Sequence, residues 1–213
     1  TPDSLNAIFE NSIFDAITIP INDKNSGFLS GDNTGDILNE IKWADVILIG
    51  PGLLSDSTDW LTSVMKNIKI PLILDASGFK PLIENKMQID ELPKETILTP
   101  HIAEFSKIFN IDMKYVKNDT ISEVKKIISI LDGRILILKG PTNIVVNSKG
   151  NIYLMSHGTP ALATAGTGDV LSGILSALAT RICDLDQVAI LGPYLHGECA
   201  HIYNKLISTD GLT

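Results

Sequence analysis

The sequence predicts an α/β fold: a three-layer α/β/α sandwich whose mostly parallel sheet carries a hairpin at one edge. From about residue 44, short apolar runs alternate with amphipathic segments, which is the pattern of parallel strands joined by helices. The runs are almost wholly apolar, as strands covered on both faces must be. After the fourth run the pattern changes to two closely spaced runs, which indicates the hairpin.

Four parallel strands and one hairpin are expected in order along this part of the chain. The parallel strands are residues 44–49, 71–75, 96–99 and 134–138, and the hairpin strands are residues 144–146 and 152–154. The hairpin turn, residues 147–150, ends in Gly150. A further strand is expected at residues 16–21.

Helices account for most of the remaining sequence. They are expected at residues 59–67, 101–109, 120–131, 169–180 and 186–207. The clearest is 120–131, where Thr120 and Glu123 fit a capping box and the apolar residues fall on one face. Cys183 and Cys199 lie in apolar stretches that indicate helix. We therefore expect buried thiols in a reducing compartment, not a disulfide or a zinc site.

Charge and composition exclude several classes of protein. The chain has 17 Lys and Arg residues against 25 Asp and Glu, which excludes a general nucleic-acid binder. Hydrophobic residues make up 44% of the sequence, enough for a buried core. No signal segment is visible, and no apolar run is long enough to span a bilayer. We expect one cytoplasmic domain over residues 1–213 that binds neither nucleic acid nor membrane.

A glycine-rich segment precedes the helix expected at 169–180. Its residues Gly166, Thr167 and Gly168 stand at a helix N-terminus, where unpaired N–H groups and a partial positive charge favour a phosphate. Asp169 follows directly, and its carboxylate could act as a general base on a substrate hydroxyl. The alternative is that Asp169 caps the helix and the glycines form a turn. The segment alone favours neither interpretation.

Other polar and glycine residues follow the predicted strands. Gly52 follows 44–49, Asp75 ends 71–75, His101 follows 96–99 and Lys139 follows 134–138. Each has a structural interpretation: a turn for Gly52, a helix-start hydrogen bond for His101 and a solvated strand end for Lys139. Because open α/β sheets bind ligands at the carboxyl ends of their strands, the group together indicates a ligand site. P-loop and dinucleotide fingerprints are absent, as is metal-ligand spacing of His and Cys.

Seven short motifs stand in a fixed order between residues 40 and 212. They are Gly50-Pro51-Gly52, Leu74-Asp75-Ala76, Thr99-Pro100-His101, Leu138-Lys139-Gly140, Gly158-Thr159-Pro160, Gly166-Thr167-Gly168-Asp169 and Tyr194-Leu195-His196-Gly197. In this order and spacing they resemble the NAD(P)H-hydrate dehydratase family, a carbohydrate-kinase-like branch of the ribokinase superfamily. The resemblance implies a ribokinase-like fold.

The resemblance also implies an activity in nicotinamide nucleotide repair. Members of the family are hydro-lyases that use ADP or ATP to remove water from the S epimer of NADHX or NADPHX, the hydrated cofactors. By this resemblance Asp169 deprotonates the ring hydroxyl, the oxygen attacks the terminal phosphoryl group, and phosphate then leaves. Mg²⁺ is expected beside the phosphates, with its protein ligands unassigned.

Binding residues follow from the same motifs. The resemblance implies substrate contacts from Gly52, His101 and Asp169. It implies nucleotide contacts from two segments, Lys139, Gly140, Pro141, Thr142 and Asn143 in the first and Gly166, Thr167 and Gly168 in the second.

Relatives in this family carry further parts. They form homo-oligomers, and many have an upstream NAD(P)HX epimerase domain, so an epimerase, fused or separate, is an expected partner. They also begin with an additional strand-helix segment and end with a further helix, both of which the domain at residues 1–213 is expected to lack. Two alternatives stay open: a kinase for a sugar or thiazole alcohol, and a catalytically silent nucleotide-binding module.

Overall fold

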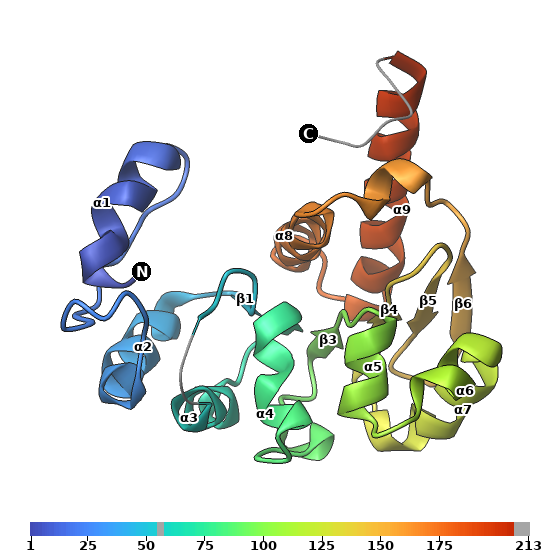
Figure 1. Ribbon diagram of the computed structural model, residues 1–213, viewed down its shortest axis with the longest axis horizontal. Coiled ribbons are helices and arrows are strands. Elements are labelled where there is room, and N and C mark those ends of the chain that lie inside the picture. The colour runs from blue at the N-terminus through green and yellow to red at the C-terminus, as the bar shows by residue number, and fades with distance from the viewer. Residues whose placement is uncertain (55–57, 207–213) are drawn as a thin grey trace.

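The computed structural model, which describes residues 1–54 and 58–206, contains one mixed sheet between two layers of helices (Figure 1). The strands are β1 (Ile47–Ile49), β2 (Leu72–Leu74), β3 (Thr96–Leu98), β4 (Ile135–Leu138), β5 (Asn143–Val146) and β6 (Ile152–Met155). They lie in the order β1-β2-β3-β4-β5-β6, with β1 to β4 parallel and β5 and β6 antiparallel. The predicted α/β sandwich with an edge hairpin is confirmed.

Helices cover both faces of the sheet. One face carries α3 (Asp59–Asn67), α4 (Lys80–Ile83), α5 (Ile102–Ile108), α6 (Met113–Asn118) and α7 (Thr120–Leu131), and the other carries α8 (Thr167–Ala179) and α9 (Leu185–Leu206) (Figure 1). Alternate strand residues pack against opposite helix layers: Leu72 and Leu74 pack with the layer of α3 to α7, and Ile73 packs with the layer of α8 and α9. The predicted end of the last helix, Ile207, lies outside the described residues.

The N-terminal part lies beside β1 at one end of the molecule (Figure 1). It contains α1 (Asp3–Ser12), which buries no residue, and α2 (Thr34–Glu40). Short 3₁₀ helices complete the connections along the chain at Gly31–Asn33, Ile41–Trp43, Ala76–Phe79, Ile89–Glu91 and Pro160–Ala163. The predicted strand at 16–21 is wrong, because only Ile21 forms a bridge, to Pro2. A β-branched run forms a strand only where a neighbouring strand is in reach.

Two local predictions are also wrong. The helix at 120–131 has the predicted bounds, but its cap is Asp119, whose carboxylate accepts from the Ser122 amide at 3.0 Å. Thr120 instead donates its hydroxyl to the Val116 carbonyl. Cys183 and Cys199 are exposed, not buried as predicted. Cys183 lies after the end of α8, and Cys199 lies on a face of α9 other than the buried one. Within the described residues, no helix has both the length and the apolar character to cross a membrane.

The loops after β1 and β2 pack against each other without room for a side chain. A Cβ atom on Gly50 would lie 1.6 Å from the Asp75 carbonyl oxygen, and Gly50 has a φ of +134°. In the opposite direction, a Cβ atom on Gly78 would lie 2.8 Å from the Ile49 carbonyl oxygen. This contact fixes the position of the chain where β2 ends.

We expect Gly50→Ala to lower the free energy of unfolding by about 3 kcal/mol or more, because steric overlap adds to the strain of a positive φ. Gly35→Ala in α2 is the control, since none of the residues that the structure describes comes within 4 Å of the added Cβ atom. It should be neutral or stabilising by up to about 1 kcal/mol. Urea denaturation of both variants measures the effect, and equal stability of the two would contradict the close packing.

Candidate functional site

The glycine segment forms the start of α8, as the sequence predicted. Gly166 is the residue before the helix and has a φ of +90°, a conformation that glycine adopts at little cost. The Thr167 hydroxyl contacts the Leu162 and Thr164 carbonyl oxygens at 2.7 and 2.8 Å, which anchors the segment. The Thr167 amide donates to the Thr164 carbonyl oxygen at 3.4 Å, but the other first amide groups of a helix have no acceptor within it, so this turn presents N–H donors to an anion.

Asp169 lies in the first turn of α8 and is exposed. Gly166 occupies the capping position, and no side chain caps the helix. Within the described part of the chain, the Asp169 carboxylate has no hydrogen-bond or salt-bridge partner. The capping interpretation therefore does not describe this residue, and its carboxylate is available to a ligand.

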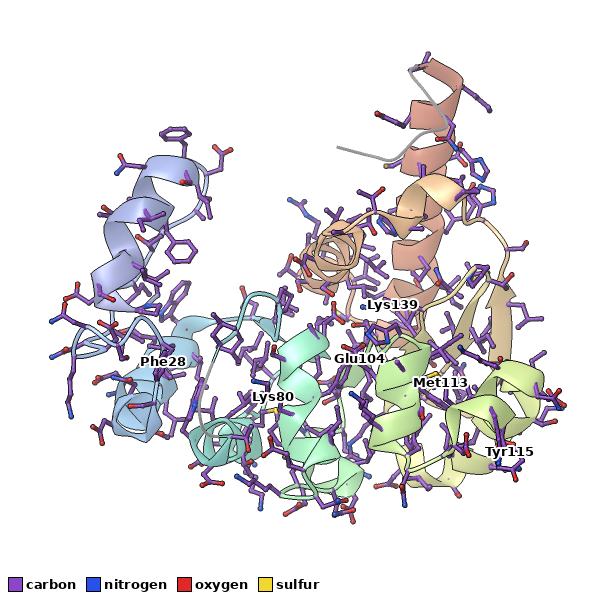
Figure 2. All side chains as sticks on the ribbon, viewed as in Figure 1. Phe28, Lys80, Glu104, Met113, Tyr115 and Lys139 are labelled. Atoms are coloured by element: carbon purple, nitrogen blue, oxygen red, sulfur yellow. The ribbon has the colours of Figure 1, made fainter. Side chains whose placement is uncertain are left out.

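Lys139 brings a positive charge to the same place. It follows β4, and its ammonium group forms a salt bridge of 2.7 Å with Asp75 after β2. A Cβ atom placed on Gly168 would lie 3.3 Å from the Lys139 Nζ atom. Figure 2 shows Lys139 between α5 and the helices of the opposite layer. The structure thus joins the lysine and the glycine segment that the sequence placed at one end of the sheet.

Two further residues hold this arrangement: Asp75, which the sequence placed at the ligand rim without a specific role, and Ser172, to which it assigned none. The Asp75 side chain is 1% exposed and also accepts from the Ser172 hydroxyl at 2.7 Å and the Ala76 amide at 2.9 Å. Ser172 is buried one turn along α8 from Gly168. An acidic residue directly after a buried strand was the available signal for Asp75, whereas Ser172 had none.

His101 performs the helix-start role that its position suggested. Its Nδ1 atom accepts from the Ala103 and Glu104 amides at 3.1 and 3.2 Å, and Glu104 accepts from the His101 amide. Because Nδ1 is an acceptor, the neutral ring carries its proton on Nε2. His101 also lies beside Lys139, whose amide donates to the Pro100 carbonyl oxygen at 2.8 Å. The ring is therefore at the rim, where its Nε2 atom lies 3.5 Å from the Glu104 carboxylate, a contact that a ligand acceptor would have to replace.

Gly52 lies in the loop after β1, two strands away from β3. Its φ is +66°, and no atom of residues 1–54 or 58–206 lies within 4 Å of where a Cβ atom would be. The Leu53 amide donates to the Gly50 carbonyl oxygen, so Gly52 is part of a turn, as its structural interpretation held. The open space beside it leaves the backbone accessible.

The segment after β4 borders an apolar cavity of about 380 Å³. The lining residues are Ile102, Thr120, Ile121, Leu138, Lys139, Gly140, Pro141, Thr142, Ile144 and Leu154. The Asn143 side chain accepts from the Gly140 amide at 3.1 Å, which closes the loop at its other end. The loop therefore has Lys139 on the side of α8 and an apolar hollow on the side of α5 and α7.

His196 of α9 is a buried histidine near this centre. Burial, and then the charge of Lys139, lower the pKa of its imidazole below the ordinary value. The sequence included His196 in a motif but assigned it no function. In the described parts of the chain, no three His, Cys, Asp or Glu side chains gather into a metal site.

Comparisons with known proteins agree on one family. Residues 10–210 match the family model described as NAD(P)H-hydrate dehydratase. The bifunctional NAD(P)H-hydrate repair enzyme Nnr of Moorella thermoacetica is 28% identical over 92% of this chain and 37% of its own length. The enzyme of the same name from Thermofilum pendens is 30% identical over 88% of this chain and 36% of its own length. The chain thus spans little more than a third of these relatives.

Solved structures give the same result. ADP/ATP-dependent NAD(P)H-hydrate dehydratase from Bacillus subtilis, co-crystallised with ATP and Mg²⁺, has a TM-score of 0.69 and 28% identity, covering 79% of this chain and 59% of that one. A ribokinase-like superfamily protein from Enterococcus faecalis V583 has a TM-score of 0.72 and 27% identity, covering 86% and 64%.

The low pKa of His196 predicts a pH dependence of stability. The unfolded chain takes up a proton at the ordinary histidine pKa, whereas the folded chain does so only at lower pH, so stability falls as pH drops through that range. We expect His196→Gln to lose less stability than the wild type between about pH 7.5 and about pH 5.5. His201→Gln, also in α9, is the control and should keep the wild-type slope. Equal slopes for all three proteins in denaturant titrations would refute the assignment.

Proposed function

The chain belongs to the NAD(P)H-hydrate dehydratase family, and we propose that it uses ADP or ATP to remove water from the S epimer of NADHX or NADPHX. The observation that most supports this activity is the convergence of Lys139, the first turn of α8 and the unpaired Asp169 carboxylate. Nucleotide phosphates need positive charge and N–H donors, and a hydroxyl nucleophile needs a base. This centre contains all three.

The phosphates would lie against the amides of Gly166, Thr167 and Gly168, with the Lys139 ammonium group beside them. Donors held in place before the reaction stabilise the charge that develops on a transferred phosphoryl group. Bound Mg²⁺ would neutralise the phosphates. Since no cluster of metal ligands occurs in the described residues, the nucleotide itself would supply most of its ligands.

Asp169 is proposed as the general base. Its carboxylate takes the proton of the hydroxyl on the hydrated ring, and the oxygen attacks the terminal phosphoryl group in line. The bond between the ring carbon and the phosphate oxygen then breaks as the ring nitrogen donates its lone pair, and inorganic phosphate leaves. Loss of a proton from the adjacent ring carbon restores the double bond of the dihydronicotinamide. Phosphate is a far better leaving group than hydroxide, which is why the nucleotide is needed.

The remaining site residues are proposed to bind the two ligands. His101 would donate from Nε2 to the hydrated cofactor, and Gly52 would allow its backbone close approach. The segment Lys139, Gly140, Pro141, Thr142 and Asn143 would bind the nucleotide, with the base entering the apolar cavity beside it. These assignments extend the family resemblance to residues whose positions at the rim are compatible with them.

The wider setting is also proposed. The curated relatives are bifunctional and much longer than this chain, so we infer that an NAD(P)HX epimerase, fused or separate, works with it. Homo-oligomers, a cytoplasmic location and a single domain without the additional terminal segments stay predictions.

The direct test is incubation of the purified chain with S-NADHX, Mg²⁺ and either ADP or ATP, following the absorbance of the restored dihydronicotinamide. We expect recovery of NADH that depends on the nucleotide. Accumulation of a stable phosphate ester from a sugar or thiazole alcohol would instead identify a small-molecule kinase. Nucleotide binding without any turnover would identify a silent binding module.

We expect Asp169→Asn to lower turnover by about 10² to 10⁴, the usual contribution of a general base. Nucleotide affinity should stay near that of the wild type, because the amides of the helix start remain. The chain contains a matched control: Asp36 ends a second Thr-Gly-Asp sequence, at the start of α2, and is exposed. Asp36→Asn should leave turnover unchanged. An Asp169→Asn enzyme that keeps more than about a tenth of wild-type turnover would exclude Asp169 as the base.

A further inference from the structure

Asp75 is buried at the centre of the candidate site. Its side chain is only 1% exposed. A buried carboxylate is costly unless it is paired and its oxygen atoms are hydrogen-bonded. The groups that donate hydrogen bonds to Asp75 therefore show which parts of the fold its buried carboxylate connects.

Those donors come from separate parts of the fold. Lys139, at the end of β4, and the Ala76 amide both donate to Oδ1, at 2.7 and 2.9 Å. Ser172 of α8 donates to Oδ2 at 2.7 Å. The Ser172 hydroxyl has one proton, and the carboxylate is closer and more basic than the Gly168 carbonyl oxygen at 3.1 Å. Asp75 thus connects the end of β2 with β4 and with α8.

The position of Lys139 depends on this connection. A lysine side chain is a flexible stem that ends in a point charge with three donors. Within the described residues, Asp75 is the one side chain that accepts from the Lys139 ammonium group. The Lys139 side chain is 20% exposed and its ammonium group lies next to Gly168, so its other donors are available on the side of the glycine segment.

Ser172 is the second side chain whose position depends on Asp75. It lies one helical turn after Gly168, and its hydroxyl holds the first turns of α8 against the end of β2. One carboxylate therefore fixes both the charge of Lys139 and the helix whose amides face the same space.

We propose that Asp75 is a positioning residue for phosphoryl transfer. Its carboxylate holds the Lys139 ammonium group beside Gly168, and through Ser172 it holds the start of α8, so that both act on one phosphoryl group. This assignment rests on the proposed function and adds Asp75 and Ser172 to the residues that the reaction requires.

A double-mutant cycle with Asp75→Asn and Lys139→Met tests the proposal. A hydrogen bond to a charged group corresponds to about a 10- to 100-fold effect, so each single variant should lose that much turnover at saturating nucleotide. Asn keeps a carbonyl oxygen that can accept from Ser172, so Asp75→Asn removes mainly the charge that holds Lys139, and the double variant should be within about threefold of Lys139→Met alone. Independent, multiplicative losses would overturn the proposal.

Binding measurements separate positioning from a general loss of structure. Calorimetry with ATP and with adenosine should show that Asp75→Asn weakens ATP binding and leaves adenosine binding unchanged, since adenosine has no phosphate. If Asp75→Asn lowered the affinities for ATP and adenosine by the same factor, or changed neither affinity, the role of Asp75 would be structural and the proposal would be wrong. Glu91→Gln is the matched control, because it breaks a 2.7 Å salt bridge with Lys66 at the other end of the sheet. It should leave turnover and both affinities unchanged.

Ser172→Ala provides a milder variant if Asp75→Asn does not fold. Loss of one neutral donor should lower turnover by about 2- to 10-fold and weaken ATP without changing adenosine. Wild-type turnover and ATP affinity in a folded Ser172→Ala protein would contradict the proposal. A wild-type chain that binds ATP but does not dehydrate S-NADHX would overturn the proposed function, and the ATP and adenosine affinities would then decide the assignment of Asp75.

Discussion

The buried carboxylate of Asp75 sets the requirement that organises this end of the sheet. The Asp75 side chain is 1% exposed to solvent. Burial of this carboxylate is tolerated because Lys139, Ser172 and the Ala76 amide donate hydrogen bonds to it. Those partners belong to the end of β4, to α8 and to the turn that follows β2. The close approach of Gly50 to the Asp75 carbonyl oxygen adds the loop after β1. A single buried group therefore aligns three strands' ends with the helix that starts at the glycine segment.

This local arrangement explains how an acidic protein can bind an anion. The chain has a net charge of −8, so long-range attraction does not favour a nucleotide. Binding must come from a short-range site, where the Lys139 ammonium group lies beside the N–H donors of the first turn of α8. The same first turn presents Asp169, which is unpaired within the described residues. Positive charge for the phosphates and a base for the hydroxyl are thus close together.

Much of the fold could be predicted because buried strands leave a clear sequence signal. The runs at 71–75 and 134–138 each extend beyond the observed strands by a residue or two, and 120–131 matches α7 in both bounds. The run at 16–21 gave a similar signal but has no partner strand. Site residues that follow parallel strands, such as Lys139, could be placed on one rim. The role of Asp75 could not, because its partners lie 64 and 97 residues away and depend on side-chain geometry.

Phosphates are proposed to bind where Lys139 meets the start of α8, and a crystal structure of this chain with ATP and Mg²⁺ tests this site. Phosphate oxygens should then lie within hydrogen-bond distance of the Gly168 amide and of Lys139 Nζ, with the base beside the 139–143 segment. Another cavity, of about 480 Å³, lies at the opposite end of the sheet and has charged side chains such as Lys66 and Arg134 in its lining. ATP bound there, or bound with its phosphates turned away from Lys139, would exclude a phosphate site at the start of α8.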